Sequence, residues 1–155
     1  MTTPSVTFRA MTENDLAQVT AIEQRSTPHP WSAAHFTDSM KTGYQCLVAE
    51  SEGRIIGHAI MMIAVDQADL MIITIDKPFQ SKGFGLQLFN HMMEVARDKE
   101  CITLLLEVRE SNTKAFNLYL NQGFSEIGIR RNYYPAGNSR EDAIVMAMDL
   151  ETQYF

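Results

Sequence analysis

Apolar positions follow a helical spacing near the start of the chain. Residues 12–15, Thr-Glu-Asn-Asp, resemble a capping box, and the apolar residues over 16–22 repeat at the period of a helix. Ser32 is typical of the N-cap of a second helix, and Gly43 is typical of its end. A short strand is predicted before both helices, over residues 6–9. The pattern therefore predicts one strand and two amphipathic helices.

The middle of the chain changes to longer apolar runs. Residues 46–49, 55–65 and 70–75 are typical of strands, and a turn at residues 51–53 joins the first two. Because strands joined by short turns pair side by side, these three are expected to form an antiparallel meander. The run over residues 55–65 is expected to be a long buried strand.

Helices and strands alternate in the next part. A helix is predicted from Gly85 on, and its Met-rich apolar stripe is expected to pack into the core: Leu86, Phe89, Met93 and Ala96. The apolar run over residues 103–108 predicts a strand buried on both faces. Because a helix precedes and follows this strand, we expect it to lie parallel to its predecessor. Ser111 or Asn112 opens a last helix, which ends at Gly123.

Two final strands, over residues 125–130 and 143–149, are expected to flank a long polar loop. Together the elements predict an α+β fold with a central mixed, mostly antiparallel sheet flanked by helices. At 155 residues, with 45% hydrophobic and 21% charged residues, the chain is typical of a single globular domain, here residues 1–155.

Charge and the lack of targeting patterns narrow the class of protein. A net charge of −6 argues against a direct nucleic-acid-binding surface and is compatible with a basic protein or an amine as partner. No apolar stretch approaches the roughly 20 residues of a membrane span, and the first residues lack the pattern of a signal peptide. We expect a cytoplasmic monomer without a membrane partner.

The histidine and cysteine residues do not indicate a metal site or another function. The four histidines show no paired metal-ligand spacing, so no metal site is expected. Cys46 and Cys101 each lie beside an apolar, strand-like run, and we expect them to be buried reduced thiols without a role.

The most informative segment is residues 79–85, Phe-Gln-Ser-Lys-Gly-Phe-Gly, between an apolar strand and an amphipathic helix. Such a loop presents unshielded backbone N–H groups at the positive end of the helix, which suits a pyrophosphate. Gln80 and Lys82 can add donors. The pattern matches neither a P-loop nor the fingerprint of a dinucleotide-binding fold. By itself the segment fits a plain turn equally well.

Two motifs, together with the order of the elements, resemble the GCN5-related N-acetyltransferase (GNAT) superfamily. One is the loop Gln-x-x-Gly-x-Gly at residues 80–85, and the other is Asn-x-x-Ala-x-x-Leu-Tyr at residues 112–119, followed by Gly-Phe at residues 123–124. The likeness covers nearly the whole chain. It implies the GNAT fold and an N-acetyltransferase that uses acetyl-CoA as cosubstrate, held in a wedge where two parallel strands splay apart.

Four further segments are similar to the bacterial branch of this superfamily that acetylates the N-terminal alanine of a small-subunit ribosomal protein: residues 30–32, 106–109, 130–135 and 141–146. The implied partner is the N-terminus of a basic ribosomal protein. Ser81 and Lys82 stand where this branch often has two arginines, so the resemblance implies weaker cofactor binding with an intact main-chain cradle.

The resemblance places acetyl-CoA between residues 70–75 and 103–108. Backbone groups of the first strand would pair with the pantetheine arm, the glycine loop would hold the pyrophosphate, and Asn112 would contact the cofactor at the last helix. The cofactor-binding residues implied in this way are Ile73, Thr74, Ile75, Ser81, Lys82, Gly83, Phe84, Gly85, Leu86 and Asn112.

Glu107 is the candidate general base. An acidic residue inside an apolar strand is costly unless it is paired or useful, and partial burial raises a carboxyl pKa toward neutrality, where it can accept a proton directly or through a water. The alternative is a strand-end glutamate paired with Arg109 or another cation. The residues by themselves favour that alternative, whereas the resemblance favours the base.

Tyr119 is the candidate acid. An aromatic residue on a helix normally packs in the core, and the resemblance gives its hydroxyl the role of proton donor to the CoA thiolate, because phenol and thiol pKa values are close. A backbone N–H beside Thr74 or Ile75 is the expected oxyanion donor.

Arg131, Tyr133 and Tyr134 are the candidate substrate-binding residues, as part of a peptide-binding rim before a Pro-Ala-Gly-Asn-Ser loop. The alternative is a solvated strand end with surface aromatics. Trp31 either packs below this rim or fills the core.

The leading hypothesis is a protein N-terminal α-amine acetyltransferase that transfers the acetyl group directly within a ternary complex, with no acyl-enzyme. One alternative is an acetyltransferase of the same superfamily that acts on a lysine side chain or a small amine. Another is a non-catalytic CoA-binding or ribosome-associated module, against which the joint presence of Glu107 and Tyr119 argues.

Overall fold

The structure is a computed structural model, and it describes residues 5–151. The elements in chain order are β1 (Thr7–Ala10), the 3-10 helix η1 (Glu13–Asp15), α1 (Leu16–Ser26), α2 (Ala33–Thr42), β2 (Gln45–Ser51), β3 (Arg54–Ala64), β4 (Gln67–Ile75), the 3-10 helix η2 (Lys77–Phe79), α3 (Phe84–Asp98), β5 (Thr103–Arg109), α4 (Thr113–Asn121), β6 (Ser125–Ala136) and β7 (Ser139–Asp149).

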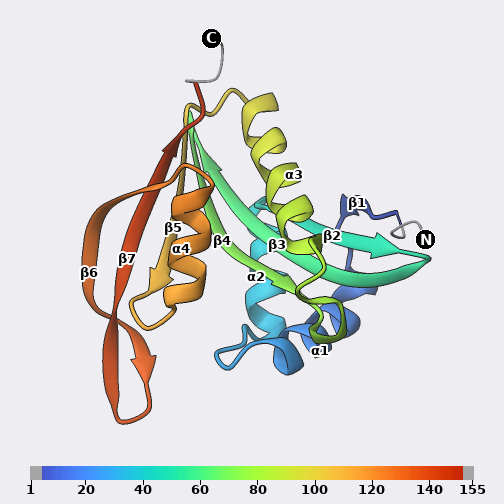
Figure 1. Cartoon of the computed structure of the whole chain (residues 1–155). Coiled ribbons are helices and arrows are strands. Elements are labelled where there is room, and N and C mark those ends of the chain that lie inside the picture. Colours follow the sequence, from blue (N-terminus) through green and yellow to red (C-terminus); the bar gives the residue numbers. More distant parts are fainter. Residues whose placement is uncertain (1–4, 152–155) are drawn as a thin grey trace.

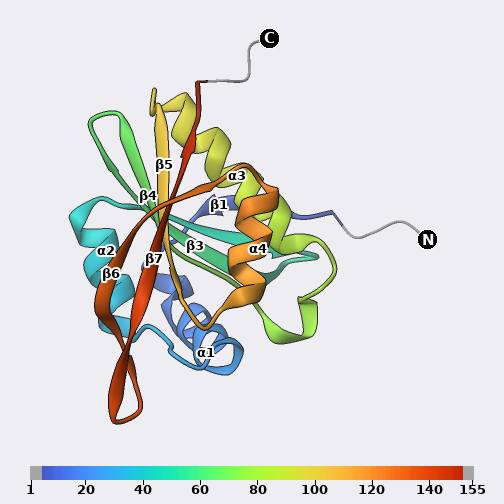
Figure 2. The same cartoon turned by 60° about the vertical axis from the view of Figure 1, so that its left-hand side comes forward.

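Across the described residues, seven strands form one sheet in the order β1-β2-β3-β4-β5-β7-β6 (Figures 1 and 2). Strands β2, β3 and β4 form the predicted antiparallel meander, and β1 pairs antiparallel with β2. At the other side of the sheet, β7 pairs antiparallel with both β5 and β6. β4 and β5 are parallel, as predicted from the intervening helix. The fold class, α+β with a mixed and mostly antiparallel sheet, is therefore confirmed.

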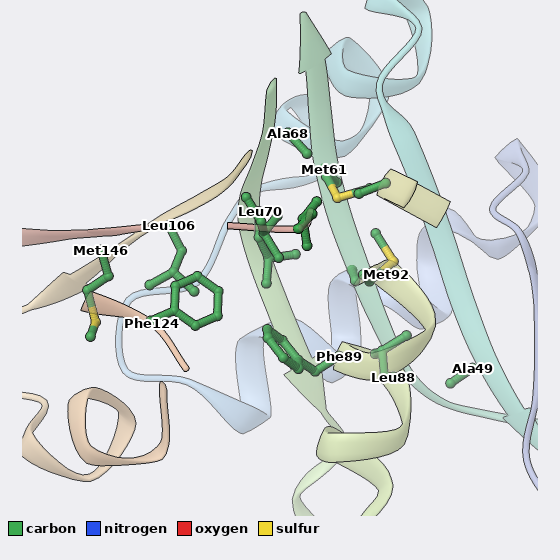
Figure 3. Packing of buried hydrophobic residues seen from close by; sticks show 14 of the residues in the cluster. Ala49, Met61, Ala68, Leu70, Leu88, Phe89, Met92, Leu106, Phe124 and Met146 are labelled. Carbon is green, nitrogen blue, oxygen red and sulfur yellow. The ribbon is translucent and has the colours of Figure 1, made fainter. Parts of the chain in front are cut away.

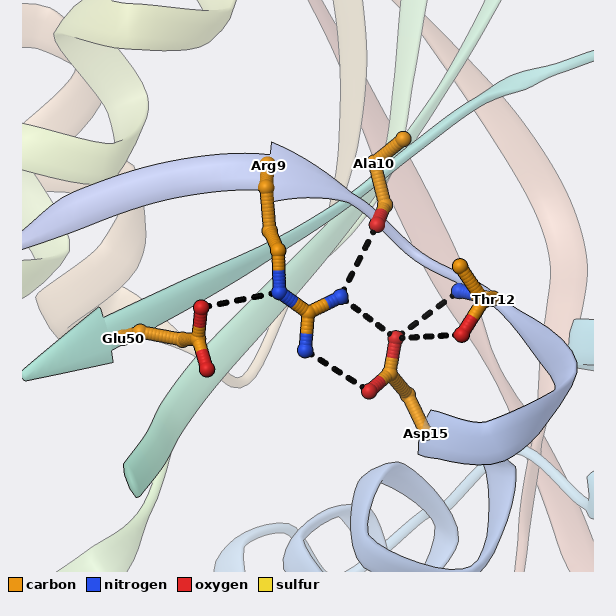
Figure 4. A network of polar contacts seen from close by, with 5 residues as sticks. All are labelled: Arg9, Ala10, Thr12, Asp15 and Glu50. Atoms are coloured by element: carbon orange, nitrogen blue, oxygen red, sulfur yellow. Dashed lines mark hydrogen bonds and ion pairs between the residues drawn. The ribbon is translucent and has the colours of Figure 1, made fainter. Parts of the chain in front are cut away.

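Local capping signals set the ends of the first helices as predicted. Thr12 and Asp15 form the capping box before α1, and Ser32 caps α2, which ends at the left-handed Gly43. Arg9 ties this region together, because its guanidinium binds Asp15 next to α1 and Glu50 on β2 (Figure 4). The hydrogen bond from Arg9 holds the pKa of Asp15 at about 2.

Helices cover both faces of the sheet. α1 and α2 pack on one face over β2 and β3, and α3 and α4 lie on the other (Figures 1 and 2). The larger core lies between the sheet and α3, and Figure 3 shows Leu88, Phe89 and Met92 facing Leu70 of β4. Among the described residues, none of the helices is long and apolar enough to cross a membrane.

The predicted stripe of α3 is partly wrong. The residues buried on this helix are Phe84, Leu88, Phe89, Met92 and Ala96. Leu86 is 41% exposed, and Met93 is half-buried at the edge of the core. The helix begins at Phe84, whose ring is buried, so the apolar face is rotated from the face that Leu86 would define.

The predicted burial of β5 on both faces is also wrong. Leu104, Leu106 and Val108 are buried, whereas Leu105 and Glu107 are half-buried on the opposite face. α3 and α4 cover the first face, but α1 and α2 lie over neighbouring strands and leave the second face of β5 partly open. This open face is where a functional site can form.

The long polar loop predicted before the last strand is a β-hairpin. β6 extends to Ala136 and β7 begins at Ser139, so the polar residues between them pair through their backbones. A register shift lies between Arg130 and Tyr134, where Asn132 has a positive φ of 52°. The polar side chains on the arms of this hairpin are exposed. A run of exposed polar residues has the sequence pattern of a loop, which is why the hairpin was predicted as one.

Both cysteines, Cys46 and Cys101, are free and buried, as predicted. Burial raises the pKa of each thiol, that of Cys46 to about 11, so both stay protonated at neutral pH.

Candidate active site

Strands β4 and β5 pair along only part of their length. Their parallel register ends at Leu70 opposite Leu106, and Met71 is the extra residue of a bulge between β4 and β3. Beyond this point the two strands diverge (Figure 1). A cavity of about 540 Å³, here called the first cavity, lies between the diverging ends and is lined by residues of both strands, of α4 and of the segment between α1 and α2.

Glu107 is the residue that follows the last parallel pair, and it lines the first cavity. Its side chain is 25% exposed, and Arg130 Nε lies 2.9 Å from its Oε2 atom. That oxygen is buried and accepts no hydrogen bond from the described residues, so the contact with Arg130 is an ion pair without hydrogen-bond geometry. The alternative of a paired glutamate is thus present, but Arg109 is not the partner, because it binds Glu141.

The pKa of Glu107 lies above its ordinary value. Burial is the largest cause, the positive charge of Arg130 acts in the opposite direction, and the carboxylate of Asp69 raises the pKa further. A carboxylate with a raised pKa is a stronger base than the same group in water.

Tyr119 lines the first cavity from α4, and its ring packs against Phe89 and Phe124. Burial raises the pKa of Tyr119 to about 12. The expected close match between this phenol and a thiol, whose pKa is about 8.5, is therefore wrong in this state. The raised value keeps the phenol protonated across the neutral range, so its hydroxyl can donate a hydrogen bond.

The backbone of β4 presents alternate residues to the first cavity. Asp76 N donates to Ile56 O on β3. Along an antiparallel strand, the backbone N–H and C=O groups of successive residues alternately bond to the partner strand and point away from it. This alternation directs the backbone groups of Ile73 and Ile75 toward the first cavity and those of Thr74 toward β3. Of the three predicted positions, Ile73 and Ile75 therefore have the geometry for an extended ligand.

The glycine loop lies at the end of the first cavity. Gln80 lines the cavity and donates from Nε2 to the carbonyl of Ile75 at 2.9 Å. Gly83, with a φ of 88°, is the N-cap of α3 and supplies no side-chain cap. The first backbone N–H groups of α3, at residues 84–86, thus have no partner inside the helix. Residues 81–86 do not line the first cavity itself.

Asn112 lines the first cavity and also caps α4, because its Oδ1 atom accepts from Ala115 N at 3.2 Å. Both the cap and the position of Asn112 at the opening of the last helix were predicted from the sequence. Capping fixes the oxygen end of the side chain and leaves its NH₂ donors available.

A second cavity, of about 300 Å³, adjoins the first at Glu107. It is also lined by Asp69, Trp31, Tyr133 and Tyr134. Two of the predicted substrate-binding residues, both tyrosines, therefore line this cavity. Trp31 lines it as well and also packs against Phe36 of the core.

The third predicted substrate-binding residue, Arg131, lines neither cavity. Its side chain is 80% exposed and binds Asp142. Arg130 approaches Glu107 in its place. A register shift in β6 between Glu126 and Gly128 sets Arg130 opposite Ala143, on the face of the sheet that carries Glu107.

Sequence reasoning missed a buried polar group beside the first cavity. Glu23 of α1 accepts hydrogen bonds from His58 Nε2 and Thr74 Oγ1, each 2.9 Å long, and from the backbone N of Trp31. Burial raises the pKa of Glu23, but these hydrogen bonds, led by that from His58, outweigh it and the pKa is lowered. A histidine in the middle of the longest apolar strand was the sequence signal that this group existed.

The comparisons with known proteins agree with this geometry. A family profile described as the acetyltransferase (GNAT) family matches residues 16–124. The chain is 38% identical over 144 residues to the ribosomal protein bS18-alanine N-acetyltransferase of Salmonella typhimurium strain LT2, across 93% of this chain and 97% of that protein. Identity to the protein of the same name from Escherichia coli strain K12 is 37%, with the same shares covered. Such enzymes are known as RimI.

A solved structure of a related enzyme has the same fold. The ribosomal-protein-S18-alanine N-acetyltransferase from Escherichia coli superimposes with a TM-score of 0.88 at 36% sequence identity, and the match covers 97% of this chain and 100% of that one. The chain therefore belongs to the acetyltransferase (GNAT) family, and it is an acetyl-CoA-dependent N-acetyltransferase with the GNAT fold.

Proposed function

We propose that the protein acetylates the N-terminal alanine of a small-subunit ribosomal protein in the cytoplasm. The relatives that cover nearly the whole chain are named for that reaction on bS18. The observation that carries the proposal is the junction of the two cavities at Glu107. One cavity suits an extended cosubstrate, the other suits a peptide, and the carboxylate lies where the two would meet.

The cosubstrate would lie in the first cavity as an added strand. Backbone groups of Ile73 and Ile75 are turned toward that space, and the amides of a pantetheine arm are suitable partners for them. The pyrophosphate would lie against the free N–H groups at the start of α3, near Ser81 and Lys82. Asn112 would add its amide donors from α4.

Glu107 would take the proton that the α-amine must lose. The amine nitrogen then forms a bond to the acetyl carbon, and the carbon–sulfur bond breaks. The backbone N–H of Ile73 or Ile75 would stabilise the negative charge that develops on the acetyl oxygen. As the sulfur leaves, the Tyr119 hydroxyl would donate a hydrogen bond to it, and the proton held by Glu107 would pass through water to the thiolate sulfur, which gives CoA as the free thiol and restores the carboxylate.

The preference for an α-amine follows from its pKa. An α-amine has a reference pKa of about 7.7–8.0 and is partly neutral at physiological pH, whereas a lysine side chain at about 10.4 needs far more help to lose its proton. A single carboxylate base fits the first task better. The aromatic walls of the second cavity can hold the first residues of an extended chain.

A competition experiment tests the proposal. The protein and acetyl-CoA are incubated with two peptides of the same sequence, one with a free N-terminal alanine and one with a blocked N-terminus and a free lysine, and the products are identified by mass spectrometry. We expect acetylation of the alanine peptide to be faster. Faster acetylation of the lysine would instead identify the alternative, a lysine or small-amine acetyltransferase with the same fold.

A further inference from the structure

The last turns of α1 run alongside the end of β4 and the start of η2. Three polar contacts join the two segments, each between residues 51 positions apart in the sequence: Glu23 with Thr74, Arg25 with Asp76, and Ser26 with Lys77. The end of α1 is therefore fastened along the stretch of chain that leads from the first cavity into the glycine loop.

The middle contact is a buried ion pair. Asp76 is fully buried, and Arg25 donates to both of its carboxylate oxygens, from Nε at 2.8 Å and from Nη2 at 2.7 Å. The guanidinium of Arg54 lies 3.8 Å from the same carboxylate. The hydrogen bonds from Arg25 outweigh the effect of burial and lower the pKa of Asp76. The carboxylate is therefore charged, and two parallel hydrogen bonds fix its direction.

The backbone of Asp76 begins the turn into the glycine loop. Its N–H donates to Ile56 O at 2.8 Å, and its carbonyl accepts from Phe79 N at 2.8 Å. Gln80 then binds back to the carbonyl of Ile75. Because the peptide groups on both sides of Asp76 are held, its buried side chain fixes the direction in which the chain leaves β4.

The loop beyond Gln80 has few means to hold its own shape. Ser81 has a positive φ of 62°, which costs energy for a residue with a Cβ atom, and Gly83 begins α3 without a side-chain cap. A loop that must become ordered when its ligand binds loses affinity through conformational entropy, whereas a loop already held in place does not. An anchor at the start of the loop can therefore strengthen binding without touching the ligand.

We propose that Asp76 and Arg25 are positioning residues for acetyl-CoA: their ion pair fixes how the glycine loop leaves β4 and so directs the free N–H groups of α3 toward the pyrophosphate. This inference rests on the proposed placement of the pyrophosphate at the start of α3. Asp76 does not line the first cavity, and it acts through the loop. Because a carboxylate repels an anion, loss of its charge alone would strengthen cosubstrate binding, whereas loss of positioning weakens it.

The matched variants are Asp76→Asn and Asp15→Asn. Arg9 binds Asp15 near the other end of α1 through the same two-bond geometry, at 2.7 and 2.8 Å, and Asp15 is also buried (Figure 4). Both substitutions break one ion pair and are expected to lower the melting temperature. We expect Asp76→Asn to raise the Kd of CoA at least about tenfold in calorimetry, which is about 1.4 kcal/mol, and Asp15→Asn to leave it within about twofold.

A thioester without a pyrophosphate separates positioning from general damage. S-acetylpantetheine carries the same acetyl group and pantetheine arm as acetyl-CoA, and a peptide with an N-terminal alanine serves as acceptor for both. We expect Asp76→Asn to lower kcat/KM for acetyl-CoA about tenfold through KM, with kcat nearly unchanged, and to leave kcat/KM for S-acetylpantetheine within about twofold. An equal loss with both thioesters would overturn the positioning role.

A double variant tests whether the two residues act as a pair. Arg25→Gln is expected to weaken CoA binding as well, and its combination with Asp76→Asn is expected to weaken binding no further than the stronger single variant, because both substitutions break the same contact. Effects on the binding free energy that add up in the double variant would contradict an ion pair that acts as one unit.

Calorimetry with CoA needs no acceptor, so it separates failure of this inference from failure of the proposed function. If the alanine peptide is not acetylated, the proposed function fails, and the CoA affinity of Asp76→Asn still decides the positioning role. An affinity that is unchanged or higher in Asp76→Asn overturns that role. If Gly83→Ala nevertheless weakens CoA binding, the placement of the pyrophosphate holds and only the role of the ion pair is refuted.

Discussion

At the scale of single residues, the proposed chemistry depends on where Glu107 lies along its strand. The residue before it, Leu106, still pairs with Leu70, and its side chain is buried in the core. Glu107 faces the opposite side, at the first position where the parallel strands have separated. Burial raises the pKa of a carboxylate there, and the side chain lines both cavities.

We expect Glu107→Gln to lower kcat by about 10²-fold or more, because general-base catalysis contributes roughly that factor. Calorimetry is expected to give an unchanged affinity for acetyl-CoA, since the amide has the same shape. Glu110→Gln removes the same charge three residues further on, at an exposed position, and is expected to keep normal turnover. Near-normal turnover in Glu107→Gln would remove this residue as the base.

Arg130 gives a prediction for pH dependence. Its charge lowers the pKa of Glu107, and the base must be deprotonated to act, so activity rises with pH through that pKa. Arg130→Gln therefore shifts the acidic limb of the kcat profile to higher pH. Arg131→Gln removes the same charge from a side chain that lines neither cavity. We expect the acidic limb of the kcat profile of this variant to stay where it is in the unmodified protein. Coincident limbs in the two variants would exclude coupling between Arg130 and Glu107.

At the scale of elements, the glycine loop and the end of α2 form a natural pair for comparison. Gly83 and Gly43 have φ values of 88° and 90°, and a Cβ atom at either would meet no atom within 4 Å. Alanine at each position therefore carries similar backbone strain, roughly 1–2 kcal/mol. Gly43 ends α2, whereas Gly83 opens the helix whose N–H groups would face the pyrophosphate.

We expect Gly83→Ala to weaken acetyl-CoA binding by about tenfold, and Gly43→Ala to leave it unchanged, although both lower the free energy of unfolding by a similar amount. The reason is that strain at Gly83 turns the loop and places a methyl group where the anion would approach. Calorimetry on both variants measures the difference. Equal affinities would show that the loop does not hold the cosubstrate.

The elements that sequence predicted well are those with local signals. Ser32 and Gly43 mark the ends of α2 because capping depends on neighbouring residues. Which face of α3 and whether both faces of β5 are buried depend on the distant elements that pack against them. The identities of Leu86 and Leu105 do not show whether such an element covers them. The hairpin arms near Asn132 pair through backbone atoms, to which a polar sequence gives no clue.

The residues of the candidate site likewise divide into those that a sequence motif identifies and those that depend on contacts between distant elements. Glu107 and Tyr119 lie in motifs that a resemblance can identify, and both line the first cavity. Glu23 approaches Thr74 only because α1 packs across β4, a contact between residues far apart in the sequence. Arg131, predicted to bind substrate, lines neither cavity, since a register shift in β6 decides that Arg130 faces Glu107.

At the scale of the whole molecule, four parallel pairs, Gln67 to Leu70 against Thr103 to Leu106, are the ladder that joins the two halves of the sheet among the described residues. The cosubstrate would continue the connection between β4 and β5 along the first cavity, where the two strands no longer pair. We expect CoA to slow hydrogen exchange of the Ile73 and Ile75 amides and to change that of Thr74 little, because Thr74 faces β3. A nucleotide without the pantetheine arm serves as the control. Equal protection by both ligands, measured by NMR, would contradict the added-strand arrangement.

The bulge at Met71 has a consequence for solubility. A sheet that opens in its interior has unpaired backbone groups, and on an outer strand such groups invite pairing with other chains and aggregation. Here they lie between β4 and β5 in a space of about 540 Å³, with α4 alongside. Groups in a cavity inside the sheet are less accessible to the edge strand of another protein than groups on an outer strand. Backbone groups that the proposed cosubstrate would pair with are thus kept away from the outer edges of the sheet, where other chains could pair with them.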